Sequence, residues 1–90
     1  MSHTSHHKST LLARVRRLKG QMEAIERALE AGAPCADILN LAASVRGATN
    51  GLVVELLKDH LRSHVVDAAD DVARDAGATE LVEVMRRHLK

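Results

Sequence analysis

The sequence predicts an all-α fold, namely a three-helix protomer with two long antiparallel helices and a short C-terminal helix. Over residues 8–31 apolar side chains recur at alternating steps of four and three, with one Gly and no Pro. Gly32 and Pro34 then interrupt this pattern, and a second long apolar segment follows at once. Two long helices joined by so short a turn form an antiparallel hairpin.

The first two helices are predicted over residues 8–31 and 35–66, with Gly32 just past the end of the first. Their apolar seams are Leu11, Val15, Leu18, Met22, Ile25 and Leu29 in the first helix, and Ile38, Leu41, Val45, Leu52 and Leu56 in the second. Gly47 and Gly51 lie one turn apart inside the second helix, where each costs about 1 kcal/mol of helix propensity. Together they predict close approach by another backbone.

The remainder of the chain predicts a loop and a short third helix. Residues 67–77 are small and acidic, which indicates a frayed helix end followed by a loop. Thr79, with Glu80 and Glu83 nearby, is expected to open the third helix. Its apolar positions are Leu81, Val82, Met85 and Leu89.

Length and composition restrict the class of protein. Residues 1–90 make one domain at most, 46% of them are hydrophobic, and none is Phe, Tyr or Trp. A small domain without aromatic side chains buries little surface, so we expect additional burial from a homo-oligomer. The chain has no apolar run of about 18 residues and no apolar signal segment, and it carries one Cys. These features predict a cytoplasmic protein with no membrane partner.

The second helix carries candidate metal ligands. His60 and His64 are four residues apart, so they share one helix face and could chelate a single ion. The alternative is a solvated histidine pair near a helix end. A lone Cys such as Cys35 is usually a small buried hydrophobic residue, so by itself it indicates a ligand only weakly.

Helix length indicates how Cys35 could join the two histidines. Cys35 and His60 are 25 residues apart on one predicted helix, which corresponds to roughly 38 Å. They can share a metal only if two copies of the helix pair in antiparallel orientation. The hairpin also returns the N-terminal arm, residues 1–7 and expected to be flexible, to the same end, where His3 and the amine of Ser2 could contribute. This mixed nitrogen and sulfur ligand set suits late first-row divalent metals.

The first helix carries a run of basic residues with no acid among them. Its members are Lys8, Arg14, Arg16, Arg17 and Lys19. One interpretation is a solvated helix face, and the other is a stripe that contacts nucleic-acid phosphates. Arg46, beside Gly47 deep in the second helix, must extend to solvent, form an ion pair or reach an anionic partner. The net charge of +1 means that nucleic-acid binding would depend on such local charge.

No motif indicates catalysis. The sequence has no Gly-rich phosphate loop, no GxSxG and no HExxH. A helical hairpin also offers little pocket for a substrate. We therefore expect that the protein is not an enzyme.

The combination of RVRRLKGQMEAIERAL, a Cys shortly after the turn, and LAASVRGATNGLVVELLKDHLRSHV resembles the CsoR/RcnR/FrmR family of small helical repressors. The resemblance covers residues 2–66 well and the last helix more loosely. It implies an antiparallel dimer that assembles to a tetramer, a dimer of dimers. It also implies double-stranded operator DNA as the partner, contacted by Arg14, Arg17 and Arg46, with Arg16 and Lys19 as neighbouring candidates.

The family's sensing positions can be assigned one at a time. They match Cys35, His60, His64 and the N-terminal Ser2 and His3. Copper sensors of the family have Cys where His64 stands, and formaldehyde sensors tend to have an acid there. The nickel/cobalt branch has the full set, although the RVRR stretch and the C-terminal helix look closer to the formaldehyde branch.

The resemblance therefore predicts a metal-responsive repressor with Ni(II) or Co(II) as effector, and with Zn(II) as a further ion that could bind in vitro. It would bind DNA in the metal-free form and release it with metal. The alternative is a formaldehyde-responsive repressor that uses Cys35 and the N-terminal amine. A third interpretation, from another class, is a metal-storage or scaffold bundle that binds no DNA.

Overall fold

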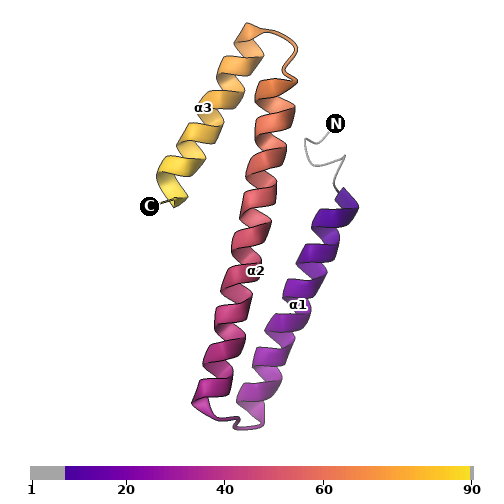
Figure 1. Cartoon of the computed structure of the whole chain (residues 1–90), viewed down its shortest axis with the longest axis vertical. Coiled ribbons are helices and arrows are strands. Elements are labelled where there is room, and N and C mark those ends of the chain that lie inside the picture. The colour runs from indigo at the N-terminus through magenta and orange to yellow at the C-terminus, as the bar shows by residue number, and fades with distance from the viewer. Residues whose placement is uncertain (1–7, 90) are drawn as a thin grey trace. The chain divides into compact units, whose positions relative to one another are not determined.

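The computed structural model describes residues 8–89. In chain order it contains α1 (Lys8–Glu30), α2 (Cys35–Leu61), a π-helical turn η2 (Arg62–Val66) and α3 (Asp71–His88) (Figure 1). The described residues include no strand, so the predicted all-α class and the three helices are confirmed. They fall into two compact units, one formed by Ser9–Val53 and one that contains η2 and α3. The predicted arm, residues 1–7, lies outside the described residues.

The turn between α1 and α2 is closed by a glycine at the helix end. Gly32 has a φ of 67°, a left-handed conformation that glycine adopts without steric cost. The N–H of Ala33 donates to the carbonyl of Ala28 at 2.9 Å, and the N–H of Gly32 donates to Leu29 at 3.1 Å. This pair of bonds is the Schellman pattern, which satisfies the last carbonyls of α1. The predicted stop at Gly32 is confirmed, and α2 begins directly after Pro34.

The predicted apolar seam of α1 divides into two sets. Every second member is buried or half-buried in the protomer: Leu11, Leu18 and Ile25. The intervening members are exposed: Val15, Met22 and Leu29. The protomer therefore covers one face of α1 and leaves a second apolar stripe in solvent.

The two glycines of α2 have different surroundings from those predicted. A Cβ added to Gly51 would lie 3.2 Å from the guanidinium of Arg14 on α1, so a side chain rather than a backbone approaches here. A Cβ on Gly47 would meet no atom of the described protomer within 4 Å. The prediction of a close backbone at this pair is therefore wrong within one protomer.

The predicted loop over residues 67–77 is also wrong, because α3 already begins at Asp71. Asp70 caps the helix: its carboxylate accepts from the N–H of Ala73 at 2.8 Å. On the other side, α2 continues beyond Leu61 as η2, in which the N–H of Asp67 donates to the carbonyl of Arg62 at 2.9 Å. The connection between the helical segments is therefore only residues 67–70.

Because Asp70 caps α3, removal of its carboxylate should lower the stability of the protein measurably. We expect Asp70→Ala to lower the free energy of unfolding by about 1 kcal/mol, because the Ala73 N–H loses its partner at the helix start. Chemical denaturation followed by circular dichroism measures this. Asp75→Ala removes the same charge from an exposed position inside α3. An equal loss in both variants would contradict the role of the cap.

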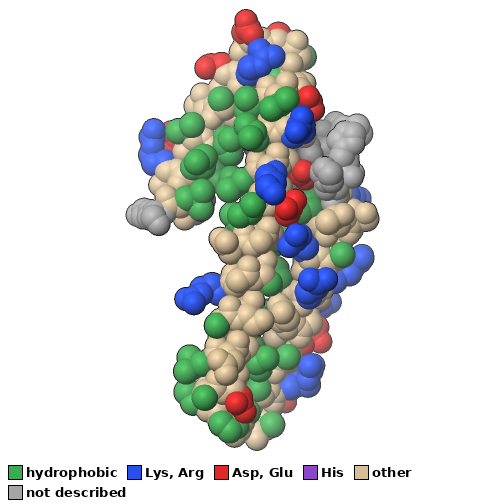
Figure 2. All heavy atoms as spheres, in the orientation of Figure 1, with side chains coloured by type: hydrophobic (Ala, Val, Ile, Leu, Met, Phe, Trp, Pro, Cys, Tyr) green, Lys and Arg blue, Asp and Glu red, His purple; other side chains and the backbone are tan. Residues whose placement is uncertain are grey.

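Apolar side chains are unusually exposed in the described residues. Leu11, at 8% exposure, is their only buried hydrophobic residue, whereas Val72 on α3 is 82% exposed. Figure 2 shows apolar side chains open to solvent along α3 and, separately, near the turn between α1 and α2. None of the helices in this part of the chain is long and apolar enough to cross a membrane. The exposed apolar surface is consistent with the predicted homo-oligomer, which stays a prediction.

Candidate functional site

The two candidate histidine ligands lie side by side. His60 is the penultimate residue of α2 and His64 belongs to η2. Their ring centroids are 4.7 Å apart with an interplanar angle of 36°. Both side chains are half-buried. The spacing of four residues thus brings two imidazoles to one place, as the sequence predicts.

A backbone carbonyl of α3 fixes the orientation of one of these rings. His60 Nε2 lies 3.0 Å from the carbonyl oxygen of Gly77. A carbonyl oxygen can only accept, so Nε2 must carry the hydrogen and donate it. In this tautomer a neutral His60 ring keeps its lone pair on Nδ1, the atom with which it can bind a metal.

The π-helical turn that carries His64 is held by α3. Arg74 Nε donates to the carbonyl of Val65 at 3.2 Å, and Arg74 is also paired with Asp71. Gly77 is buried, and a Cβ there would overlap the main chain of His64. Sequence reasoning missed both Arg74 and Gly77, because residues 67–77 looked like a loop. The available signal was a glycine inside a run of helix-forming residues, which often marks close packing.

The other candidate ligands are not brought to the histidine pair within the described residues. Cys35 is an exposed free thiol at the first residue of α2. Ser2 and His3 lie outside the described residues. Within residues 8–89 no group of three His, Cys, Asp or Glu side chains could hold a metal. Within residues 8–89 one protomer therefore supplies two adjacent imidazoles, a donor pair that fits late first-row divalent ions.

The candidate DNA-binding side chains form no ion pair with another described residue. Arg16, Arg17, Lys19 and Arg46 are exposed, and Arg14 is half-buried beside Gly51. The ion pairs found in the described part of the chain involve other residues, namely Lys58–Glu55, Arg74–Asp71 and Arg86–Glu83. The α1 basic residues and Arg46 are therefore available to an anionic partner.

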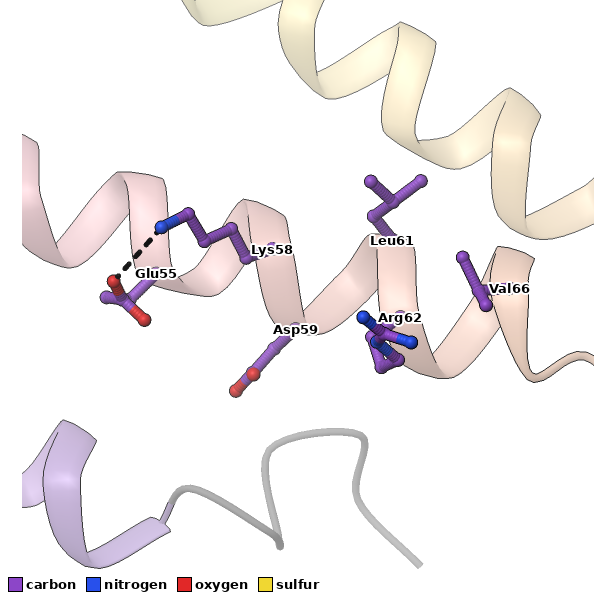
Figure 3. Close-up of a pocket in the computed structure, with 6 residues that line it drawn as sticks. All are labelled: Glu55, Lys58, Asp59, Leu61, Arg62 and Val66. Carbon is purple, nitrogen blue, oxygen red and sulfur yellow. Dashed lines mark ion pairs between the residues drawn. The ribbon is translucent and has the colours of Figure 1, made fainter.

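An open cavity of about 310 Å³ lies along the end of α2 (Figure 3). Its lining residues are Glu55, Lys58, Asp59, Leu61, Arg62 and Val66. Lys58 Nζ is 3.7 Å from Glu55 Oε1, and Asp59 is buried at 7% exposure. Two carboxylates and two cations balance one another here, so charge alone selects neither an anion nor a cation.

Comparisons with known proteins agree with the repressor resemblance. Residues 7–87 match the model of the family described as "Metal-sensitive transcriptional repressor". The chain is 47% identical to an uncharacterised protein encoded in the bioA 5' region of Serratia marcescens, over the full length of both chains. It is 37% identical to the transcriptional repressor RcnR of Citrobacter koseri, again over both full chains.

A solved structure shows the same fold. It is a glutamate-to-histidine variant of the formaldehyde-responsive regulator FrmR from Salmonella enterica serovar Typhimurium. The match has a TM-score of 0.88 and 43% identity, and it covers 98% of this chain and 100% of the other. Together with the family match, these similarities mean that the chain belongs to the CsoR/RcnR/FrmR family of metal-sensitive transcriptional repressors, which are not enzymes.

Proposed function

We propose that this repressor responds to Ni(II) or Co(II). The observation that carries the proposal is the His60–His64 pair, with ring centroids 4.7 Å apart. The formaldehyde sensors of the family tend to have an acid where this chain has His64, whereas the nickel/cobalt sensors have His. The chain also aligns with RcnR over its full length, at 37% identity.

The proposed site needs a second protomer. Ser2, His3 and Cys35 of one chain would meet His60 and His64 of an antiparallel neighbour, and two such dimers would form the tetramer. The exposed apolar stripe of α1 and the exposed apolar side chains of α3 supply surface for these contacts. The thiol of Cys35 is exposed, so it is accessible for binding a metal together with side chains of another chain. In this proposal residues 1–90 act as a single domain.

The proposed partner is double-stranded operator DNA, bound in the cytoplasm. Arg14, Arg17 and Arg46, with Arg16 and Lys19, would contact phosphates and read DNA shape. Metal binding would bring residues of two chains together around one ion. This would shift α1, so that its basic side chains would no longer align with the phosphates of the duplex. If metal weakens DNA binding, DNA must weaken metal binding by the same factor.

His64 offers a test of effector choice. We expect His64→Glu to lower Ni(II) and Co(II) affinity by at least tenfold, because a carboxylate replaces a nitrogen ligand that these ions favour. DNA affinity without metal should stay within twofold of the unaltered protein. Competition titration with a chromophoric chelator, followed by a gel shift, measures both. His88→Glu, which makes the same replacement at the end of α3, is the matched control. Equal metal affinity in the His64 and His88 variants would remove His64 from the site.

Formaldehyde is the second candidate effector. The similarity to FrmR at a TM-score of 0.88 and the exposed thiol of Cys35 favour it. The Cys35 thiolate would add to the aldehyde carbon, and the N-terminal amine would then displace the hydroxyl group. The product is a methylene bridge between sulfur and nitrogen, with one water released.

The two effectors give different results in one experiment. A gel shift on the promoter beside the protein's own gene is followed during addition of Ni(II), Co(II) or formaldehyde. Release by metal with no change in protein mass supports the proposed function. Release by formaldehyde with a mass gain of one carbon, in metal-free buffer, supports the alternative. Absence of any shift before either addition would favour a metal-binding scaffold.

A further inference from the structure

We propose that Gly77 of α3 is the positioning residue of the histidine pair. It sets the tautomer of His60 and the place of His64 through two separate contacts. This inference rests on the proposed function, in which both histidines bind the effector metal. Both contacts lie within one protomer.

The first contact is close packing on the main chain of His64. A Cβ added to Gly77 would lie 2.7 Å from the carbonyl carbon of His64 and 2.8 Å from its Cβ, and closer still to its carbonyl oxygen. These atoms belong to the backbone or are bonded to it, so they cannot move aside as a flexible side chain would. Only glycine at this position lets α3 lie so close to η2.

The second contact is the hydrogen bond from His60 Nε2 to the Gly77 carbonyl oxygen, at 3.0 Å and partly buried. A carbonyl inside a helix has a second lone pair beyond its helical bond, so it can accept from the ring as well. Bonds of this kind fix the tautomer and the orientation of a metal-binding imidazole. A side chain at Gly77 would lift this carbonyl away from His60.

A further hydrogen bond between α3 and η2 lies next to these two contacts. Arg74, one turn before Gly77, donates from Nε to the carbonyl of Val65 in η2 at 3.2 Å. The turn that carries His64 is thus held at two successive turns of α3. Among the glycines inside helices, Gly77 alone would place its added Cβ against main chain: Gly20 and Gly47 have nothing within 4 Å, and Gly51 meets a side-chain tip.

Gly77→Ala separates this role from ordinary helix stability. Alanine favours a helix interior more than glycine does, so propensity alone would make the variant more stable. Gly20→Ala, in α1 and with open space around it, is the matched control. Both variants are compared with the unaltered full-length protein in two measurements.

The first measurement is the tautomer of His60 in metal-free protein, read from the ¹⁵N shifts of its imidazole by NMR. We expect the Nε2–H form in the unaltered protein and in Gly20→Ala, and a mixture of tautomers in Gly77→Ala. A different tautomer in the unaltered protein would overturn the proposal, even if Gly77→Ala did not fold. This readout requires neither metal sensing nor DNA binding, so its outcome is independent of the proposed function.

The second measurement is the affinity for Ni(II) by competition titration. Loss of a partner that orients a metal-binding histidine typically lowers affinity by about 10- to 100-fold, and we expect a loss of that size in Gly77→Ala and none in Gly20→Ala. A folded Gly77→Ala protein with unchanged tautomer and affinity would overturn the proposal. No Ni(II) binding by the unaltered protein, together with the expected tautomers, would instead contradict the proposed function and leave the positioning of His60 by Gly77 supported.

Discussion

Cys35→Ala is expected to abolish the response to metal while leaving DNA binding intact. The thiol is exposed and lies at the first residue of α2, so its removal opens no cavity in the protomer. The only sulfur donor of the proposed site is lost, and the remaining ligands are nitrogens. Gel shifts on operator DNA should show unchanged affinity without Ni(II) and no release at metal concentrations that fully dissociate the unaltered protein. A full response in Cys35→Ala would place the site elsewhere.

A mixing experiment tests whether the site is formed between chains. Cys35→Ala and His60→Ala chains are each expected to be unresponsive alone. In a mixed antiparallel dimer, Cys35 of one chain meets His60 of the other, so one complete site is restored. Co-refolding the two variants should therefore recover part of the metal response. No recovery in mixed oligomers that are confirmed by mass spectrometry would contradict a site shared between chains.

Arg14→Ala is expected to lower DNA affinity and to flatten its dependence on salt. Removing a side chain that neutralises one phosphate reduces the slope of log affinity against log salt by about 0.9. Because an oligomer presents several copies of Arg14 to one operator, the reduction multiplies with the number of copies that touch the duplex. Fluorescence anisotropy at several salt concentrations measures the slope.

Arg27→Ala is the matched control for Arg14, since it removes the same charge from the last turn of the same helix. We expect its slope to equal that of the unaltered protein. If the Arg14 and Arg27 variants showed equal slopes, Arg14 would be excluded from the interface. Because the Arg14 guanidinium lies beside Gly51 of α2, circular dichroism checks that the hairpin of the Arg14 variant remains folded.

Much of the fold follows from local sequence signals. The helical spacing of apolar residues in α1, Gly32 at the end of that helix and Pro34 after it predict the hairpin. The start of α3 differs from the prediction because the segment from Asp71 to Gly77 has too few large apolar residues to show helical spacing. A glycine in such a segment resembles a loop residue. The capping carboxylate of Asp70 is the signal that residues 71–77 are helical.

The candidate site is predictable from sequence only where it is local. His60 and His64 are neighbours because four residues make about one helical turn. The bond between His60 and Gly77 joins residues 17 apart across a helix boundary, and no local pattern encodes it. In the proposed site, Cys35 would meet the histidines only across a second chain, and a single-chain pattern does not encode that position.

The near absence of buried apolar residues has a consequence for folding. With Leu11 as the only buried hydrophobic side chain among the described residues, an isolated protomer has little to offset its conformational entropy. In the proposed oligomer, folding and self-association would form one equilibrium, whose position depends on the protomer concentration. The folded fraction of such a regulator would then rise with its own concentration.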